Sequence, residues 1–101
     1  MSGEPFSVMS TKPRDMGGRI TARPGLTFSP RTVRLMEEMV AAGARVHVDG
    51  GLDQPHGLRQ FPFCKVRDRR GRQVVDFVTD GDHAEAVEGA YQYWAYVAGR
   101  P

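Results

Sequence analysis

The chain has 101 residues, of which 40% are hydrophobic and 26% are charged, a balance that fits one small globular domain and excludes a collagen-like fibre or a wholly disordered chain. Its 14 basic and 12 acidic residues leave a formal net charge of +2, a surplus too small to indicate a nucleic-acid partner by itself. No apolar run approaches a membrane span or the core of a signal peptide, and the single cysteine, Cys64, cannot form an internal disulfide, so we expect a cytoplasmic protein that contacts no membrane.

The N-terminal part of the chain shows neither helical nor strand periodicity. Residues 1–18 mix charged residues with prolines and end in two glycines, which predicts a flexible arm followed by a single α+β domain over residues 19–101. A short strand is expected at Arg19–Ala22. It ends there because Pro24 and Gly25 interrupt an extended segment.

The first helix is signalled at both ends. Ser29 is a good N-cap, Pro30 suits the first helical position, and Gly43 is typical of the residue just past a helix, so we predict a helix over Pro30–Ala42. Apolar residues recur at helical spacing on its inner face, namely Val33, Met36 and Val40, with Leu35 and Met39 beside them.

Three strands with a period of two follow this helix. We predict them at Arg45–Asp49, Phe61–Asp68 and Arg72–Thr79, with a polar connection over Leu52–Arg59 between the first two. The segment between the second and third strands favours a hairpin whose type I turn places Gly71 in the left-handed conformation.

The last predicted helix begins with a capping box in which Asp82 is the N-cap and Glu85 is the third helical residue. An apolar stripe then follows at helical spacing: Val87, Ala90, Tyr91, Trp94 and Val97. The resulting order, β-α-β-β-β-α, predicts helices packed on one face of a mostly antiparallel sheet.

The densest charge feature is the hairpin over residues 59–72. Six cations stand there against Asp68 alone, a local charge of +5, and they are Arg59, Lys65, Arg67, Arg69, Arg70 and Arg72. Because Arg side chains can form bidentate hydrogen bonds with phosphates and neighbouring aromatic side chains can stack on bases, these six residues are candidate contacts to DNA or RNA.

The residues from Val66 through Arg72 and Phe77 to Thr79, followed by the helix over 84–94, resemble the three-stranded sheet and helix that precede many tyrosine recombinases. That resemblance implies DNA recognition by the sheet. The β-β-β-α order preceded by a helix also resembles double-stranded-RNA-binding domains and ribosome-hibernation factors, which rely on basic residues at the final helix. Here the start of that helix is acidic instead, so RNA binding through it is not implied.

The C-terminal helix suggests protein recognition. Tyr93 and Tyr96 are turned away from the apolar stripe, and exposed tyrosines are typical of interface hot spots. Together with the acidic start of the helix they define the candidate protein interface, which comprises Asp82, Glu85, Glu88, Tyr93 and Tyr96.

The sequence also contains two candidate reactive sites. His47, Asp49, Asp53 and His56 lie within ten residues and could hold a divalent ion, but they match no established ligand spacing. Cys64 could pair with a histidine as a nucleophile, although its strand position favours packing as a small apolar residue. We therefore expect no catalytic residue, no metal and no cofactor.

The sequence favours a small, non-catalytic regulatory or accessory binding protein that acts through protein contacts, either with another protein or with itself as a homodimer. A nucleic-acid-binding module that uses the hairpin is the alternative. A metal-dependent or cysteine-based enzyme is a third hypothesis.

Overall fold

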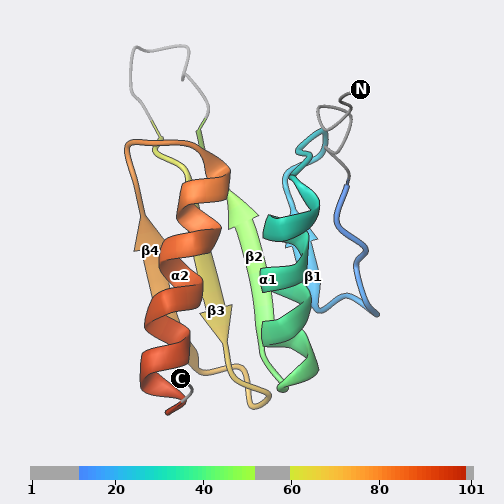
Figure 1. Ribbon diagram of the computed structural model, residues 1–101, viewed down its shortest axis with the longest axis vertical. Helices are drawn as coiled ribbons and strands as arrows, with labels where there is room; N and C mark the ends of the chain where they lie inside the picture. Colours follow the sequence, from blue (N-terminus) through green and yellow to red (C-terminus); the bar gives the residue numbers. More distant parts are fainter. Residues whose placement is uncertain (1–11, 52–59, 100–101) are drawn as a thin grey trace, which may run out of the picture.

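The computed structural model describes residues 12–51 and 60–99 (Figure 1). Its elements follow the chain as β1 (Ile20–Ala22), α1 (Pro30–Ala41), β2 (Arg45–Asp49), β3 (Phe63–Arg67), β4 (Gln73–Val78) and α2 (His83–Val97). This order confirms the predicted β-α-β-β-β-α arrangement. Within the described ranges, no helix is long and apolar enough to cross a membrane.

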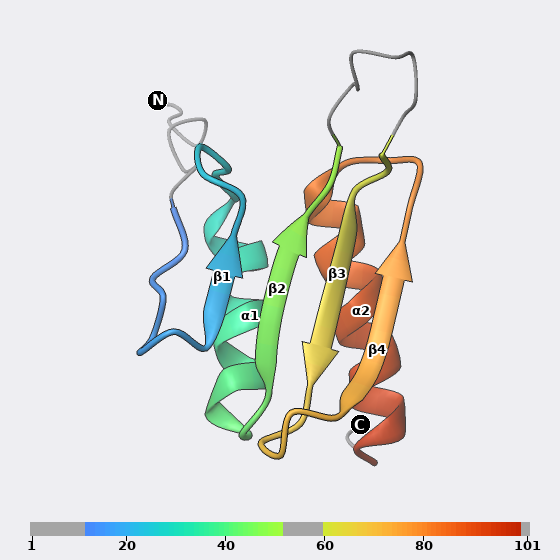
Figure 2. The same cartoon turned by 180° about the vertical axis from the view of Figure 1, so that it is seen from behind.

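The four strands form one sheet in the order β1-β2-β3-β4. β1 runs parallel to β2, while the β2–β3 and β3–β4 pairs are antiparallel, so the sheet is mixed and mostly antiparallel. Both helices lie on the same face of the sheet, and the view from behind shows the other face without a covering helix (Figure 2). The fold is therefore the predicted α+β domain with helices on one face.

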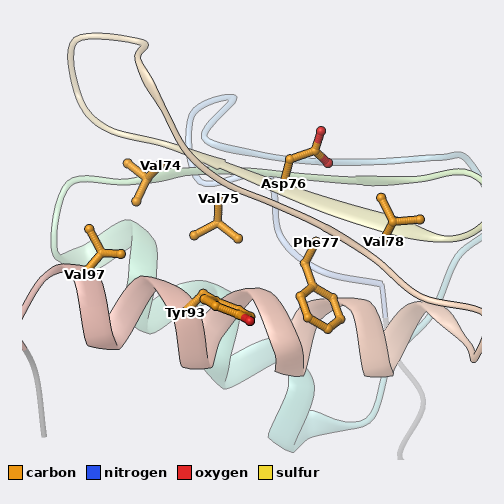
Figure 3. Close-up of a pocket in the computed structure, with 7 residues that line it drawn as sticks. All are labelled: Val74, Val75, Asp76, Phe77, Val78, Tyr93 and Val97. Atoms are coloured by element: carbon orange, nitrogen blue, oxygen red, sulfur yellow. The ribbon is translucent and has the colours of Figure 1, made fainter.

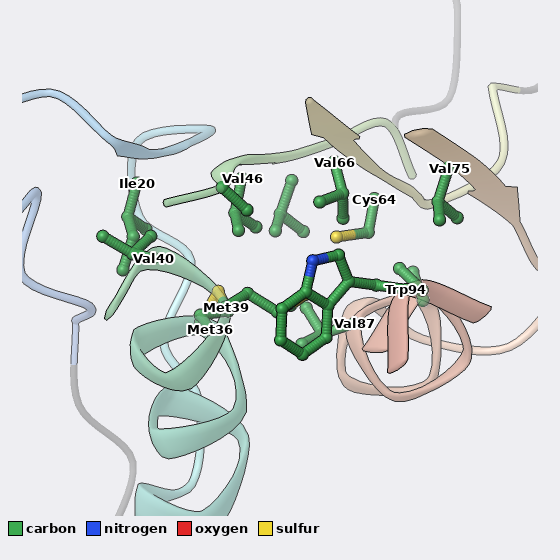
Figure 4. Packing of buried hydrophobic residues seen from close by; sticks show 14 of the residues in the cluster. Ile20, Met36, Met39, Val40, Val46, Cys64, Val66, Val75, Val87 and Trp94 are labelled. Carbon is green, nitrogen blue, oxygen red and sulfur yellow. The ribbon is translucent and has the colours of Figure 1, made fainter. Parts of the chain in front are cut away.

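The core lies between the sheet and the two helices (Figure 4). Alternate strand residues point into it, while α1 contributes two methionines and α2 contributes a valine and a tryptophan. The fully or almost fully buried side chains include Met36, Met39, Val46, Val48, Cys64, Val66, Val87 and Trp94. Each large apolar side chain removed from water contributes about 1.5–3 kcal/mol, so this layer is the main source of stability.

The predicted helix caps are confirmed. The Ser29 side chain accepts a hydrogen bond from the Thr32 amide, and Asp82 and Glu85 form both halves of the capping box. Val97 is the exception among the predicted core positions of α2, because 62% of it is exposed. It lies on the side of α2 that faces the edge strand β4, beyond which no further described strand covers the helix.

The hairpin strands are shorter than predicted. β3 begins at Phe63 rather than Phe61, because Pro62 lacks the N–H that a strand ladder requires. β3 ends at Arg67 because the turn starts at Asp68, whose carbonyl accepts a hydrogen bond from the Gly71 amide at 2.9 Å. Gly71 has the expected positive φ of 84°.

The predicted N-terminal arm and the polar connection lie mostly outside the described residues. The part of the arm that is described, residues 12–18, contacts the domain. Arg14 forms an ion pair of 3.3 Å with Glu37 of α1, and Met16 packs against the core. The connection over Leu52–Arg59 lies outside the described residues, and so do Asp53 and His56.

Candidate functional site

The strand alternation gives the open face of the sheet its own set of side chains. In β2, Val46 and Val48 point into the core, so Arg45, His47 and Asp49 point to the open side. In β3, Cys64 and Val66 are buried, so Phe63, Lys65 and Arg67 point to the same open side as those β2 residues. The sequence alternation places Lys65 and Arg67 on one strand face with Phe61 and Phe63; the structure has Phe63 on that face, while Phe61 precedes the strand.

The register brings cations from neighbouring strands together. Arg45 lies opposite Arg67, and His47 lies opposite Lys65 on one side and Thr21 on the other. A concavity of about 360 Å³ opens over these positions, and its lining is Gly18, Arg19, Thr21, Arg45, Val46, His47, Lys65, Arg67 and Gly71. The lining thus holds four permanent cations and no carboxylate.

Among the described residues these four cations have no acidic partner within ion-pair distance, whereas several other arginines do. Arg14, Arg31 and Arg72 form ion pairs with Glu37, Glu88 and Asp68 respectively. No described carboxylate forms an ion pair with any of the four open-face cations, Arg19, Arg45, Lys65 and Arg67. Asp76 lies opposite Lys65 in the β3–β4 register, but it is outside the lining of the concavity. Like charges gathered in one concavity repel one another, so a bound anion would relieve that repulsion.

Aromatic groups adjoin the cations on the same face. The His47 ring lies 5.9 Å from the Phe63 ring, and the Lys65 ammonium lies 5.3 Å from the centre of Phe63. His47 Nδ1 and Thr21 Oγ1 are 2.7 Å apart, which fixes the orientation of the imidazole. The open face therefore combines positive charge with the flat surface of a half-buried ring.

Several charged groups of the hairpin turn already have partners within the molecule. The Asp68 carboxylate accepts hydrogen bonds from the amides of Arg72 and Arg70 and pairs with the Arg72 guanidinium at 3.0 Å. These bonds, the Arg72 amide foremost, hold the pKa of Asp68 below its usual value. The Arg69 guanidinium lies against Gly43, just past the C-terminal end of α1, where the helix dipole favours a cation.

The six predicted nucleic-acid contacts consequently separate. Lys65 and Arg67 lie together on the open face. Arg72 instead pairs with Asp68 within the turn, and Arg69 lies against Gly43 at the end of α1. Arg70 is exposed in the turn, and Arg59 lies outside the described residues. The sequence analysis does not identify Arg19 and Arg45 as site residues. The alternation of the strands indicates which face they occupy, but their position beside Arg67 depends on the register between strands.

The five predicted protein-interface residues do not form one surface. Asp82 and Glu85 are engaged in the capping box, and Glu88 pairs with Arg31 of α1 at 3.2 Å. Tyr93 lies on the other side of α2, where its ring is 5.9 Å from Phe77 of β4. Tyr96 is 84% exposed.

The two reactive-site hypotheses gain little from the geometry. His47 and Asp49 approach to 3.6 Å, but the described residues hold no group of three or more metal-ligating side chains. Burial, with a smaller contribution from Asp76, raises the pKa of the Cys64 thiol to about 12, so the thiol is protonated at neutral pH. Cys64 packs in the core, as its strand position predicted.

Comparisons of the chain with models of protein families, with curated proteins and with solved structures found no match. Function must therefore be inferred from the chemistry of the surfaces described above.

Proposed function

We propose that this protein is a non-catalytic module that binds single-stranded nucleic acid on the open face of its sheet. The observation that carries the proposal is the concavity lined by Arg19, Arg45, Lys65 and Arg67, which holds four cations and no carboxylate. Phosphate contacts of this kind supply much of the affinity of nucleic-acid-binding proteins, because each one releases condensed counter-ions.

The position of the cations on the open face of the sheet favours a single strand over a duplex. Recognition of a duplex groove usually requires a protruding helix or ribbon, whereas the cations here line a concavity on the sheet. A single strand can lay its phosphates along the cations and stack a base on an exposed ring. The ring of Phe63, with His47 beside it, is the candidate stacking platform.

The decisive variant reverses the two adjacent charges on β3, Lys65→Glu with Arg67→Glu. We expect it to abolish detectable binding of a labelled single-stranded oligonucleotide measured by fluorescence anisotropy at low salt. Neutralising one contact, as in Arg45→Gln, should reduce the slope of log affinity against log salt by about 0.7, the value for a single-stranded phosphate contact.

The control is Arg34→Glu, compared with Lys65→Glu alone so that each variant changes the net charge by −2; Arg34 is an exposed residue of α1 on the opposite side of the molecule. This variant should bind the oligonucleotide almost as well as the unaltered protein. Failure of the unaltered protein to bind any single-stranded oligonucleotide at low salt would overturn the proposal. An equal loss in Arg34→Glu would show that only the net charge matters.

The alternative that the sequence favoured, protein contacts through Asp82, Glu85, Glu88, Tyr93 and Tyr96, stays a prediction. Its residues point in several directions from α2, so the geometry supports it as a single site less well than it supports the open face.

A further inference from the structure

The outer edge of β4 presents backbone groups that no described strand uses. The Thr79 amide donates to the Pro62 carbonyl at 3.0 Å, so the Thr79 backbone groups face β3. Backbone groups in an antiparallel strand alternate in direction, which places those of Asp76 and Val78 on the outer edge. Natural edge strands are commonly protected by Lys, Pro or a β-bulge. β4 contains no Lys or Pro, and its one register irregularity lies at its start, opposite Val66 and Arg67, so the pairing from Val75 to Val78 is regular.

An apolar groove adjoins this edge, between β4 and α2 (Figure 3). Val75 and Phe77 point toward α2, whereas Asp76 points away from it. The full lining is Val74, Val75, Asp76, Phe77, Val78, Tyr93 and Val97. Of the large hydrophobic residues that are exposed in the described chain, Val78, Tyr93 and Val97 all belong to this groove, with 56%, 58% and 62% of each exposed. Such clustering is typical of an interaction surface.

The charges along the edge identify the partner. The exposed Arg70 of the turn lies before the start of β4, and the exposed Asp80 follows its end; neither side chain forms an ion pair with a described residue. A second copy aligned antiparallel would place the cationic end of each strand beside the acidic end of the other. The edge is thus complementary to itself under a two-fold axis, as an isologous dimer interface requires.

We propose that a second copy of this chain pairs antiparallel with β4, so that the two sheets join into one continuous sheet. The α2 helices of the two copies would then lie side by side, and Tyr93 and Val97 would be covered by the partner helix. Since a two-fold axis perpendicular to the sheet keeps both open faces on one side, the cationic concavities of the two copies would face the same way.

The edge is tested with Val78→Pro, measured by light scattering over a concentration series. Proline removes the outward N–H of residue 78 and leaves the hydrogen bonds to β3 in place, so we expect the dimer dissociation constant to rise at least about tenfold. Val78→Ala is the matched control, because it shortens the same side chain but keeps the N–H, and it should remain mostly dimeric. Circular dichroism should show that both variants are folded.

A charge exchange tests the orientation. Asp80→Arg should weaken the dimer by placing like charges together at both ends, and adding Arg70→Asp should restore it. A monomeric unaltered protein at every concentration, or a Val78→Pro variant that dimerises as tightly as Val78→Ala, would overturn the inference. A charge exchange without restoration would contradict the antiparallel arrangement. None of these outcomes depends on nucleic-acid binding, which is measured separately.

Discussion

Gly50 and Gly71 show how the same backbone conformation can carry different constraints. Both have a φ of +84°, a backbone conformation that is unfavourable for any residue with a Cβ atom. A Cβ at Gly71 would meet nothing within 4 Å, whereas one at Gly50 would lie 2.2 Å from the carbonyl oxygen of Phe61. In addition, His83 Nε2 donates a hydrogen bond of 2.8 Å to the Gly50 carbonyl, which links the start of α2 to the end of β2.

We expect Gly71→Ala to lower the free energy of unfolding by about 1 kcal/mol, the usual penalty of a left-handed residue with a side chain. Gly50→Ala should lower it by about 3 kcal/mol or more, because the backbone of residue 61 must also shift. Urea denaturation of the two variants measures both values. Equal losses would mean that the close approach of residues 50 and 61 is not a constraint.

At the scale of elements, the capping box gives Asp82 a structural role that competes with its predicted role in an interface. Its side chain accepts a hydrogen bond of 2.8 Å from the Glu85 amide, and the Asp82 amide donates to Glu85 in return at 3.0 Å. Asp82→Ala should therefore lower the free energy of unfolding by about 1 kcal/mol. Asp80→Ala removes a nearby exposed carboxylate that is not the cap, and it should change the stability little in the same urea experiment.

The helices and strands were largely predictable because their signals are local. Caps at Ser29 and Asp82 and the period of two in β2 and β3 depend on neighbouring residues, and the structure confirms them. The predicted burial of Val97 is wrong because helical spacing indicates a face but not how far the sheet extends beneath it. The β3 start was misplaced because the apolar pattern outweighed the missing N–H of Pro62.

The candidate site was predictable only in part, because it depends on strand register. Lys65 and Arg67 stand in the charged hairpin and were identified from the sequence. Arg19 and Arg45 come from separate, weakly charged segments, and only the parallel β1–β2 pairing and the β2–β3 register bring them beside the hairpin. The sequence shows which residues share a strand face, whereas the order of strands decides which faces adjoin.

For the molecule as a whole, the sheet separates two environments. The helix-covered side is apolar and holds Cys64, while the open side is charged and holds Asp76 on the adjacent strand. Burial, and to a smaller extent the charge of the Asp76 carboxylate, raises the pKa of Cys64 from 9.0 to about 12. Both effects disfavour the thiolate in the folded state, so the division between the two faces links pH to global stability.

The sign of this link follows from the two pKa values of Cys64. Below pH 9 the thiol is protonated in both the folded and unfolded states, and its contribution is fully present. Between pH 9 and about 12 the unfolded chain ionises while the folded protein does not, so stability falls by about 1.4 kcal/mol per pH unit. Cys64→Ala should be less stable at neutral pH because of the cavity, but its stability should fall less steeply above pH 9. Urea denaturation at several alkaline pH values compares the slopes, and parallel slopes would contradict a buried, protonated Cys64.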